Sequence, residues 1–185
     1  HSFPTRRSSD LISYSCTSGS IINGEEAVMR EIKKGAPYAK PMTLVTGVID
    51  ALNELGAKKI VVGTPYLDEV NTAEAEFLLK KGFEVLDIQG LNLTTGTEMG
   101  RVTPEFWKKF AVEIDHPEAD VIFLSCGGIR ALEVVEEIEQ LTGKPVITSN
   151  QAQMWSCLRR AGIKDELNGF GQIFKKPGKT LWPHS

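Results

Sequence analysis

Short apolar runs alternate with longer amphipathic stretches along most of the chain. The apolar runs predict strands at residues 11–15, 58–66, 83–89, 119–126 and 144–150. The amphipathic stretches predict helices at residues 25–35, 41–56, 67–82, 103–114, 129–143 and 151–162. Near-continuous apolar strands that alternate with helices indicate a parallel sheet covered on both faces. The sequence therefore predicts a doubly wound α/β fold.

Helix-end signals support these ranges. Gly56 and Gly82 each follow an amphipathic stretch, where a glycine in the left-handed conformation commonly ends a helix. Thr103 and Pro104 open another stretch with an N-cap residue followed by a first-turn proline. The pattern thus predicts where several helices begin and end.

Two of the predicted strands end in similar chemistry. Residues 15–19 read "SCTSG" and residues 125–128 read "SCGG", so each strand leads through Ser-Cys into small residues. Ligands bind at the carboxyl ends of strands in such folds, and a thiol near unpaired N–H groups ionises more readily. The repeat suggests two similar α/β halves that face one another, with one cysteine each. Cys16 alone is more simply explained as a packing residue; the pair favours chemistry.

Other side chains near these strand ends could bind an acid. The Thr17 and Ser18 hydroxyls, together with backbone N–H groups, predict a carboxylate pocket. Gly127 would allow the backbone to approach a ligand closely. Tyr66, at the end of "IVVGTPY", could donate its phenol to a carboxylate or an enolate oxygen.

Composition excludes several classes of protein. The formal net charge is −3, and the absence of a basic stripe argues against a nucleic-acid partner. No apolar run approaches membrane-spanning length. The three cysteines are odd in number and widely spaced, which predicts free thiols in a reducing cytoplasm. Cys157, in the middle of a predicted helix, is interpreted as structural.

The sequence lacks the residues that several other kinds of active site need. The histidines are His1, His116 and His184, and none offers a convincing base for a cysteine or serine hydrolase. Metal-binding spacings and the phosphate-loop and dinucleotide motifs are missing from the sequence. "TSGS" could still cradle a phosphate, so a non-catalytic small-molecule or phosphate-binding module stays open as an alternative.

Four motifs in order carry a family resemblance: "CTSGS", "TPYLDEVN", "SCGGIRA" and "SNQAQMW". From Ile12 to Phe174 the chain resembles the aspartate/glutamate racemase superfamily. The subgroup it resembles contains maleate cis-trans isomerase, arylmalonate decarboxylase and the ectoine-utilization racemase-like protein. The resemblance implies two pseudo-symmetric halves with parallel sheets, an active site in the cleft between them, and no metal or organic cofactor.

The resemblance also implies roles for individual residues. Cys16 and Cys126 would face the substrate from opposite sides as the catalytic pair. The implied substrate-binding residues are Thr17, Ser18, Tyr66, Asn92 and Gly127, of which Asn92 has the loosest match and Gly127 contributes a backbone donor.

The expected domain organisation is unusual at the N-terminus. Read back into codons, "HSFPTRRSSDL" matches one frame of a common sequencing-adapter oligonucleotide, so residues 1–11 are expected to be an artefact or a disordered tail. Residues 12–57 with about 162–185 are expected to form the first half, and residues 58–161 the second. Family members open with a strand and an asparagine-bearing loop that this chain lacks. We therefore expect an N-terminally truncated fragment with an incomplete first half.

The function expected from the resemblance is a cofactor-independent isomerase or racemase that acts on a small carboxylic acid through two cysteines. Arylmalonate decarboxylases hold glycine at the first cysteine position, so Cys16 favours isomerase or racemase over decarboxylase, which stays the alternative within the superfamily. The expected partner is a small carboxylate, with no nucleic acid and no membrane, and a homo-oligomer stays open.

Overall fold

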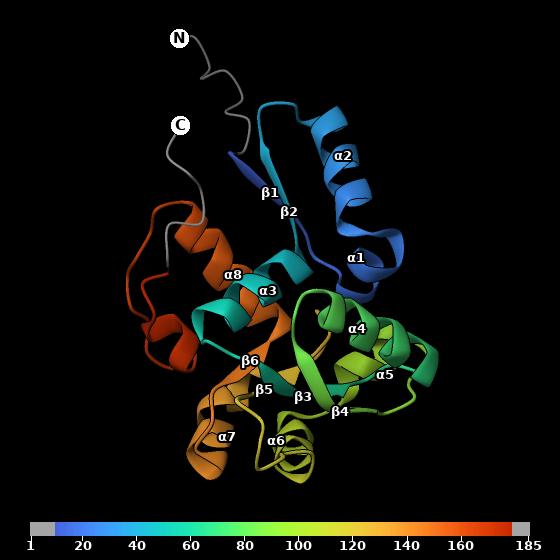
Figure 1. Cartoon of the computed structure of the whole chain (residues 1–185), viewed down its shortest axis with the longest axis vertical. Helices are drawn as coiled ribbons and strands as arrows, with labels where there is room; N and C mark the ends of the chain where they lie inside the picture. Colours follow the sequence, from blue (N-terminus) through green and yellow to red (C-terminus); the bar gives the residue numbers. More distant parts are fainter. Residues whose placement is uncertain (1–9, 179–185) are drawn as a thin grey trace.

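The computed structural model describes residues 10–178, which form two parallel sheets with helices packed around them (Figure 1). β1 (Leu11–Tyr14) pairs with β2 (Lys40–Thr43). The larger sheet has the order β4-β3-β5-β6 and consists of β3 (Lys59–Thr64), β4 (Glu84–Gly90), β5 (Val121–Leu124) and β6 (Val146–Thr148). The predicted α/β class with parallel sheets is confirmed.

Helices separate the successive strands, with two helices after β1 and two after β4. They are α1 (Thr17–Asn23), α2 (Glu25–Gly35), α3 (Leu44–Glu54), α4 (Asp68–Lys80), α5 (Gly96–Arg101), α6 (Pro104–Glu113), α7 (Val135–Thr142) and α8 (Ser149–Arg160), with short 3-10 turns η1 (Leu132–Val134) and η2 (Gln172–Lys175). Thr103 caps α6 and Pro104 occupies its first turn, as predicted.

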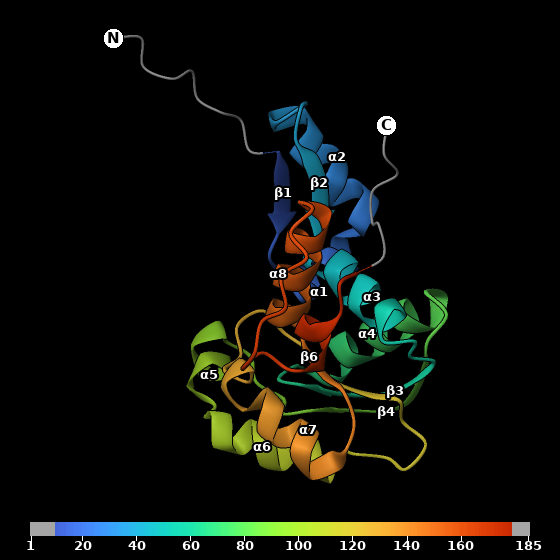
Figure 2. The ribbon, with the colours of Figure 1, turned by 90° about the vertical axis from the view of Figure 1, so that its left-hand side faces the viewer.

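Strands β3, β5 and β6 of the larger sheet are buried on both faces. Ile60 and Val62 of β3 pack into the cluster that holds Trp155 of α8, whereas Val61 between them packs against Trp107 of α6. Figure 2 shows the same arrangement, with α6 and α7 on one side of the sheet and α3 and α8 on the other. Burial on both faces explains why these strands read as continuous apolar runs.

The predicted helix at residues 41–56 is wrong at its start. Residues 40–43 form β2, and α3 begins only at Leu44. Thr43 and Thr46 form a reciprocal capping box that fixes the helix start. The paired strand β1 and a buried Met42 hold the preceding residues extended.

Two further boundaries differ from the predicted ranges. The stretch at 129–143 becomes helical only at Leu132, through η1 and then α7. The strand at 144–150 ends at Thr148, which caps α8 through a box with Gln151. The pattern also missed α5, whose start is fixed by a Thr95–Glu98 capping box in a stretch with little apolar periodicity.

The ends of the chain bear on the domain predictions. Residues 1–9, most of the predicted tail, lie outside the described residues, whereas Leu11 of β1 pairs with Lys40 of β2. The described part of the segment at about 162–185, which is expected to belong to the first half, packs against α8. Its Ile173 and Phe174 belong to the same core cluster as Trp155 of α8. The division into two halves stays a prediction.

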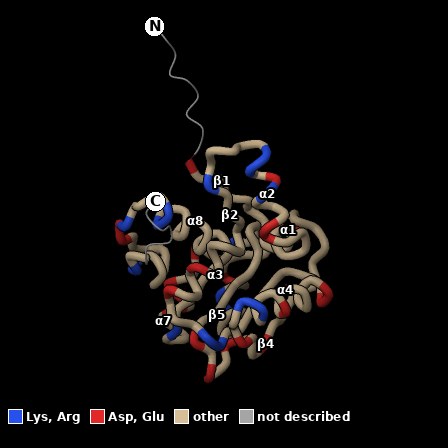
Figure 3. The backbone as a smooth tube through the Cα atoms, turned by 45° about the horizontal axis from the view of Figure 1, so that its top comes forward, with Lys and Arg blue, Asp and Glu red and all other residues tan. Residues whose placement is uncertain are grey.

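Lysine and arginine positions are interspersed with aspartate and glutamate positions along the backbone (Figure 3). Several form exposed pairs within one helix, such as Lys34–Glu31 and Arg30–Glu26. Within residues 10–178, no helix combines the length and apolar character needed to cross a bilayer.

Candidate functional site

A cavity of about 340 Å³ lies where the loops after β1, β3 and β5 meet. Its lining residues come from these loops, from α1, from the start of α4, and from the segment after β4 together with α5. They are Ser15, Cys16, Thr17, Ser18, Ile22, Tyr66, Leu67, Val70, Leu93, Thr94, Met99, Cys126, Gly127 and Gly128. The volume suits a small organic ligand.

Cys16 lies at the start of α1 and caps it. Its backbone is extended, with φ −148°, and its Sγ accepts the Gly19 N–H at 3.3 Å. The Ser18 hydroxyl lies 3.8 Å from the same sulfur. The Tyr14 phenol also adjoins it, and the charge of a Cys16 thiolate raises the pKa of Tyr14. Cys16 is therefore a half-buried thiol supplied with hydrogen-bond donors.

Cys126 sits in a tighter loop just beyond β5. It is 7% exposed and has φ 125°, a region that non-glycine residues rarely occupy. Its N–H donates to the Ser149 hydroxyl at 3.0 Å, and its Sγ accepts the Gly128 N–H at 3.2 Å. Asn150 Nδ2 donates to the Gly127 carbonyl at 2.9 Å. Residues at the start of α8 thus hold a strained loop in place.

The surroundings of Cys126 favour its neutral thiol. Burial, the largest cause, raises its pKa, and the charges of Cys16 and Glu74 raise it further. Hydrogen bonds from the Tyr66 phenol and the Gly128 N–H act in the opposite direction. The pKa of Tyr66 is itself raised, mainly by burial, so the phenol keeps its proton and can donate it.

The two thiol loops share one hydroxyl. Ser149 is fully buried and accepts hydrogen bonds from Thr17 Oγ1 and from the Cys126 N–H, each at 3.0 Å. Thr17 is itself buried, with 1% exposure. A single side chain at the start of α8 therefore fixes the loop after β1 relative to the loop after β5.

The lining contains no ionisable cation or carboxylate among its fourteen residues. One part consists of hydroxyls, thiols and glycine backbone; the other consists of Ile22, Leu67, Val70, Leu93 and Met99. A carboxylate in this cavity would be bound by neutral donors, and the apolar side chains would contact the rest of the ligand. The chemistry available is thiol proton transfer or thiolate addition, with a phenol to stabilise negative charge.

The structure brings most of the sequence-predicted site residues together. Both cysteines, Thr17, Ser18, Tyr66 and Gly127 all line the cavity. Asn92 does not: its side chain is exposed, and the following residues Leu93 and Thr94 reach the cavity instead. Its φ of 56° turns the chain, and its N–H donates to the Tyr66 carbonyl at 3.1 Å. A role for Asn92 in binding stays a prediction.

Sequence reasoning missed several neighbours of the thiols. Ser149 belongs to the "SNQAQMW" motif, which was singled out without assigning its serine a contact. Tyr14 precedes the first Ser-Cys pair by one residue, and Glu74 carries no local signal at all, because only the fold buries it beside Ser125.

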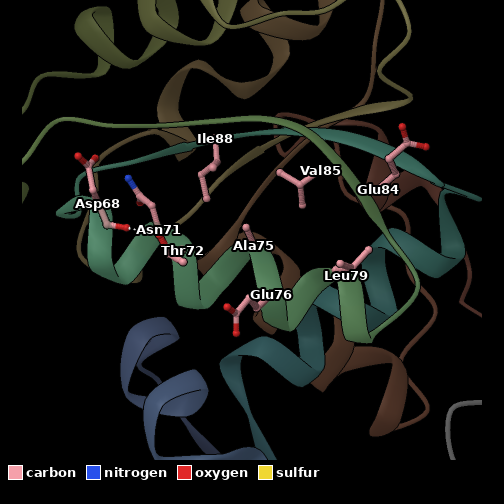
Figure 4. Close-up of a pocket in the computed structure, with 9 residues that line it drawn as sticks. All are labelled: Asp68, Asn71, Thr72, Ala75, Glu76, Leu79, Glu84, Val85 and Ile88. Atoms are coloured by element: carbon pink, nitrogen blue, oxygen red, sulfur yellow. Dashed lines mark hydrogen bonds between the residues drawn. The ribbon is translucent and has the colours of Figure 1, made fainter.

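A second groove, between α4 and β4, offers different chemistry (Figure 4). Asp68, Glu76 and Glu84 lie around an apolar floor that includes Ala75, Val85 and Ile88. Its nine lining residues include no cysteine, histidine or tyrosine. In the part of the chain that the structure describes, no cluster of three or more His, Cys, Asp or Glu side chains could hold a metal ion.

Known proteins match over most of the chain. An arylmalonate decarboxylase from Bordetella bronchiseptica is 30% identical over 159 residues, which span 84% of this chain and 65% of that protein. A maleate isomerase from Nocardia farcinica is 25% identical over 175 residues, spanning 90% of this chain and 70% of that protein. The solved structure of the maleate isomerase Iso from Pseudomonas putida S16 has the same fold, with a TM-score of 0.85 at 20% identity over 91% of this chain and 71% of that one.

The family follows from the extent of the match. The model of the arylmalonate decarboxylase family matches residues 5–174, and so includes both cysteine loops and every element from β1 to the first residues of η2. The motifs that predicted the superfamily all lie within this range. The chain belongs to the arylmalonate decarboxylase family, in the aspartate/glutamate racemase-like superfamily.

Proposed function

We propose that the protein is a cofactor-independent isomerase or racemase that uses Cys16 and Cys126 as a pair of thiols on a small carboxylic acid. One observation carries the proposal: both sulfurs line a single cavity whose other polar groups are neutral hydrogen-bond donors and acceptors. Relatives named as maleate isomerase and arylmalonate decarboxylase support a reaction of this superfamily, isomerisation or decarboxylation.

In a racemase reaction, the Cys16 thiolate removes the proton from the α-carbon and becomes a thiol. The electron pair moves into the carboxylate as an enolate, which the Tyr66 phenol and neighbouring donors stabilise. The Cys126 thiol then delivers its proton to the opposite face of the carbon and becomes a thiolate. The reverse reaction begins from that thiolate, so no proton is gained or lost.

In a cis-trans isomerisation, the Cys16 thiolate forms a bond to one alkene carbon, and the Cys126 thiol protonates the other. Rotation about the resulting single bond, return of the proton to Cys126 and breakage of the carbon–sulfur bond give the trans acid. Thr17, Ser18 and the Gly127 backbone are proposed to bind the carboxylate. Both routes need reduced thiols, which supports a reducing compartment such as the cytoplasm.

The apolar part of the cavity bears on the substrate. Ile22, Val70 and Met99 lie beside the thiols without a charge to pair with a second carboxylate. We therefore favour an acid with one apolar substituent at the reacting carbon over a short diacid. The decarboxylase alternative takes a malonate, which carries a second carboxylate beside such an apolar substituent, and the two reactions are separated by whether carbon dioxide is released.

The test is to incubate the protein in D₂O with maleate, aspartate, 2-arylpropionates and an arylmalonate, each separately, and to follow the proton NMR spectrum of the small acid. With the wild type we expect deuterium at the α-carbon or a cis-to-trans change of the acid. We expect neither with Cys16→Ser or with Cys126→Ser. Cys157→Ser is the matched control, because Cys157 lies outside the cavity with its sulfur 3.4 Å from Met42 Sδ.

Three outcomes would contradict the proposal. Turnover that survives in both serine variants would remove the thiols from the reaction. Decarboxylation of the arylmalonate without any exchange, racemisation or isomerisation would favour the decarboxylase. Ligand binding without turnover, unchanged in Cys16→Ser, would favour a binding module.

A further inference from the structure

Glu74 of α4 is a buried carboxyl group with too few partners. The residue is 1% exposed, and its Oε1 accepts the Ser125 hydroxyl at 2.6 Å. Its Oε2 is buried and has no hydrogen-bond partner. Within residues 10–178, no lysine, arginine or histidine forms an ion pair with it. Burying a carboxylate with a single donor is strongly unfavourable, so a structural role alone does not account for this residue.

Another buried glutamate shows what a structural role looks like. Glu139 of α7 is 9% exposed, and its oxygens accept the Val146 N–H and the Gln172 N–H at 3.0 Å. It joins β6 to η2 and leaves neither oxygen without a donor. Glu74 has one donor, and that donor is the hydroxyl of the residue directly before Cys126.

A structural contact and an electrostatic effect link Glu74 to the thiol. Ser125 is the hinge between β5 and the strained Cys126 peptide, and its own N–H donates to the Gly63 carbonyl at 2.8 Å. Burial raises the pKa of the Glu74 carboxyl to about 7, so the group exchanges its proton near neutral pH. A negative charge at Glu74 raises the pKa of both Cys126 and Tyr66.

We propose that Glu74 is a positioning residue for Cys126: through Ser125 it fixes the thiol loop, and as a buried carboxylate it adds to the burial that keeps the Cys126 sulfur protonated. This inference rests on the proposed two-thiol function, and it assigns Cys126 as the proton donor and Cys16 as the thiolate. As pH rises through about 7, Glu74 ionises and its charge opposes formation of a second anion at Cys126.

The charged and titratable groups near Cys126 come from several elements. Cys16 lies at the start of α1, Tyr66 in the loop after β3, and Glu74 on α4. Of the elements packed on α4, α1 adds no charge, and β4 adds Glu84 and Asp87, both exposed. None of these groups is a cation. The charges of Cys16 and Glu74 therefore both oppose ionisation of the Cys126 sulfur.

The experiment measures alkylation of each cysteine by iodoacetamide as a function of pH, with peptide mass spectrometry to separate the three sites. Glu74→Gln removes the charge and keeps an oxygen for Ser125. We expect the midpoint of the pH profile for Cys126 alkylation to fall by about one pH unit. At a pH below the midpoints of both the wild type and the variant, Cys126 is then alkylated about tenfold faster in the variant. The profile of Cys157 should not change. Glu76→Gln is the matched control, because Glu76 is an exposed glutamate of the same helix.

An unmoved Cys126 midpoint in a folded Glu74→Gln protein would overturn the proposal. If that variant fails to fold, carbon-13 NMR of the wild-type glutamate carboxyls decides: titration of Glu74 near 7 supports the proposal, and titration near the ordinary value of about 4.3 overturns it. Both readouts need no substrate. If the Cys126 alkylation midpoint shifts in Glu74→Gln but the wild type turns over no substrate, only the proposed function is refuted. If the wild type turns over substrate but the midpoint does not shift, only the role of Glu74 is refuted.

Discussion

The two cysteine loops begin with the same Ser-Cys pair and hold their sulfurs in opposite environments. Cys16 is half-buried, has an extended backbone and caps a helix. Cys126 is 7% exposed, has a positive φ and lies near the carboxyl of Glu74. A repeated motif at two strand ends therefore does not imply two equivalent thiols. The difference suits one thiolate and one thiol at the same time, which a reaction at opposite faces of a carbon needs.

Each thiol also has a neighbouring tyrosine. Removing one tyrosine hydroxyl at a time should give the largest difference in activity between the two thiol environments. Tyr66→Phe removes the phenol that bonds to Cys126 and would face an enolate. We expect kcat for α-deuteration to fall roughly 10²–10³-fold, as for loss of one oxyanion donor. The Cys126 alkylation midpoint should rise, because the hydrogen bond that lowers its pKa is lost.

Tyr14→Phe is the counterpart at Cys16. Tyr14 is 38% exposed, so water can replace its hydroxyl, and we expect a loss of less than tenfold in the same assay. Equal losses in the two variants would contradict an asymmetric site.

The shared Ser149 hydroxyl offers a way to disturb both loops at once. Ser149→Ala leaves the buried Cys126 N–H and the Thr17 hydroxyl without their acceptor. We expect the free energy of unfolding to fall by about 2 kcal/mol, measured by urea denaturation. Ser18→Ala is the control, because its partly exposed hydroxyl can bond to water, and its effect should be within about 0.5 kcal/mol. A loss as small as that of the control would show that water replaces Ser149.

A third prediction compares the thiols without any substrate. At pH 8, iodoacetamide should modify Cys16 at least roughly tenfold faster than Cys126. Burial raises the pKa of Cys126, so less of it is thiolate at a given pH, and its buried sulfur is also less accessible. The rate at Cys126 should rise steeply at more alkaline pH. Equal rates at pH 8 would remove the basis for assigning different roles.

The sequence predicts those residues of the site that lie within a short motif or at the end of a predicted strand. Cys16, Thr17 and Ser18 are consecutive, and Tyr66 and Gly127 each sit at a strand end that apolar patterning locates. Parallel strands bring the ends of β3 and β5 to one edge of the larger sheet, and the loop after β1, in the other sheet, completes the cavity.

What the sequence could not predict depends on tertiary contacts. Glu74 reads as one more polar residue on a helix, and only packing of α4 against the sheet buries it beside Ser125. The sequence pattern predicts helix where β2 lies, because residues 40–43 carry no strand periodicity of their own and are held extended by pairing with β1. The positive φ of Cys126 likewise has no signature in a Ser-Cys-Gly-Gly run.

The smallest expected effect concerns Asn92, which the family resemblance placed in the site. Its side chain is exposed and outside the cavity lining, whereas Thr94 two residues later is inside it. Asn92→Gly is the clean variant, because glycine accepts the φ of 56° without the strain that alanine would add. We expect KM and kcat within about twofold of wild type, against a larger rise in KM for Thr94→Ala. A strong rise in KM for Asn92→Gly alone would mean that the segment after β4 closes over the substrate, and would restore Asn92 as a partner of the carboxylate opposite the two thiols.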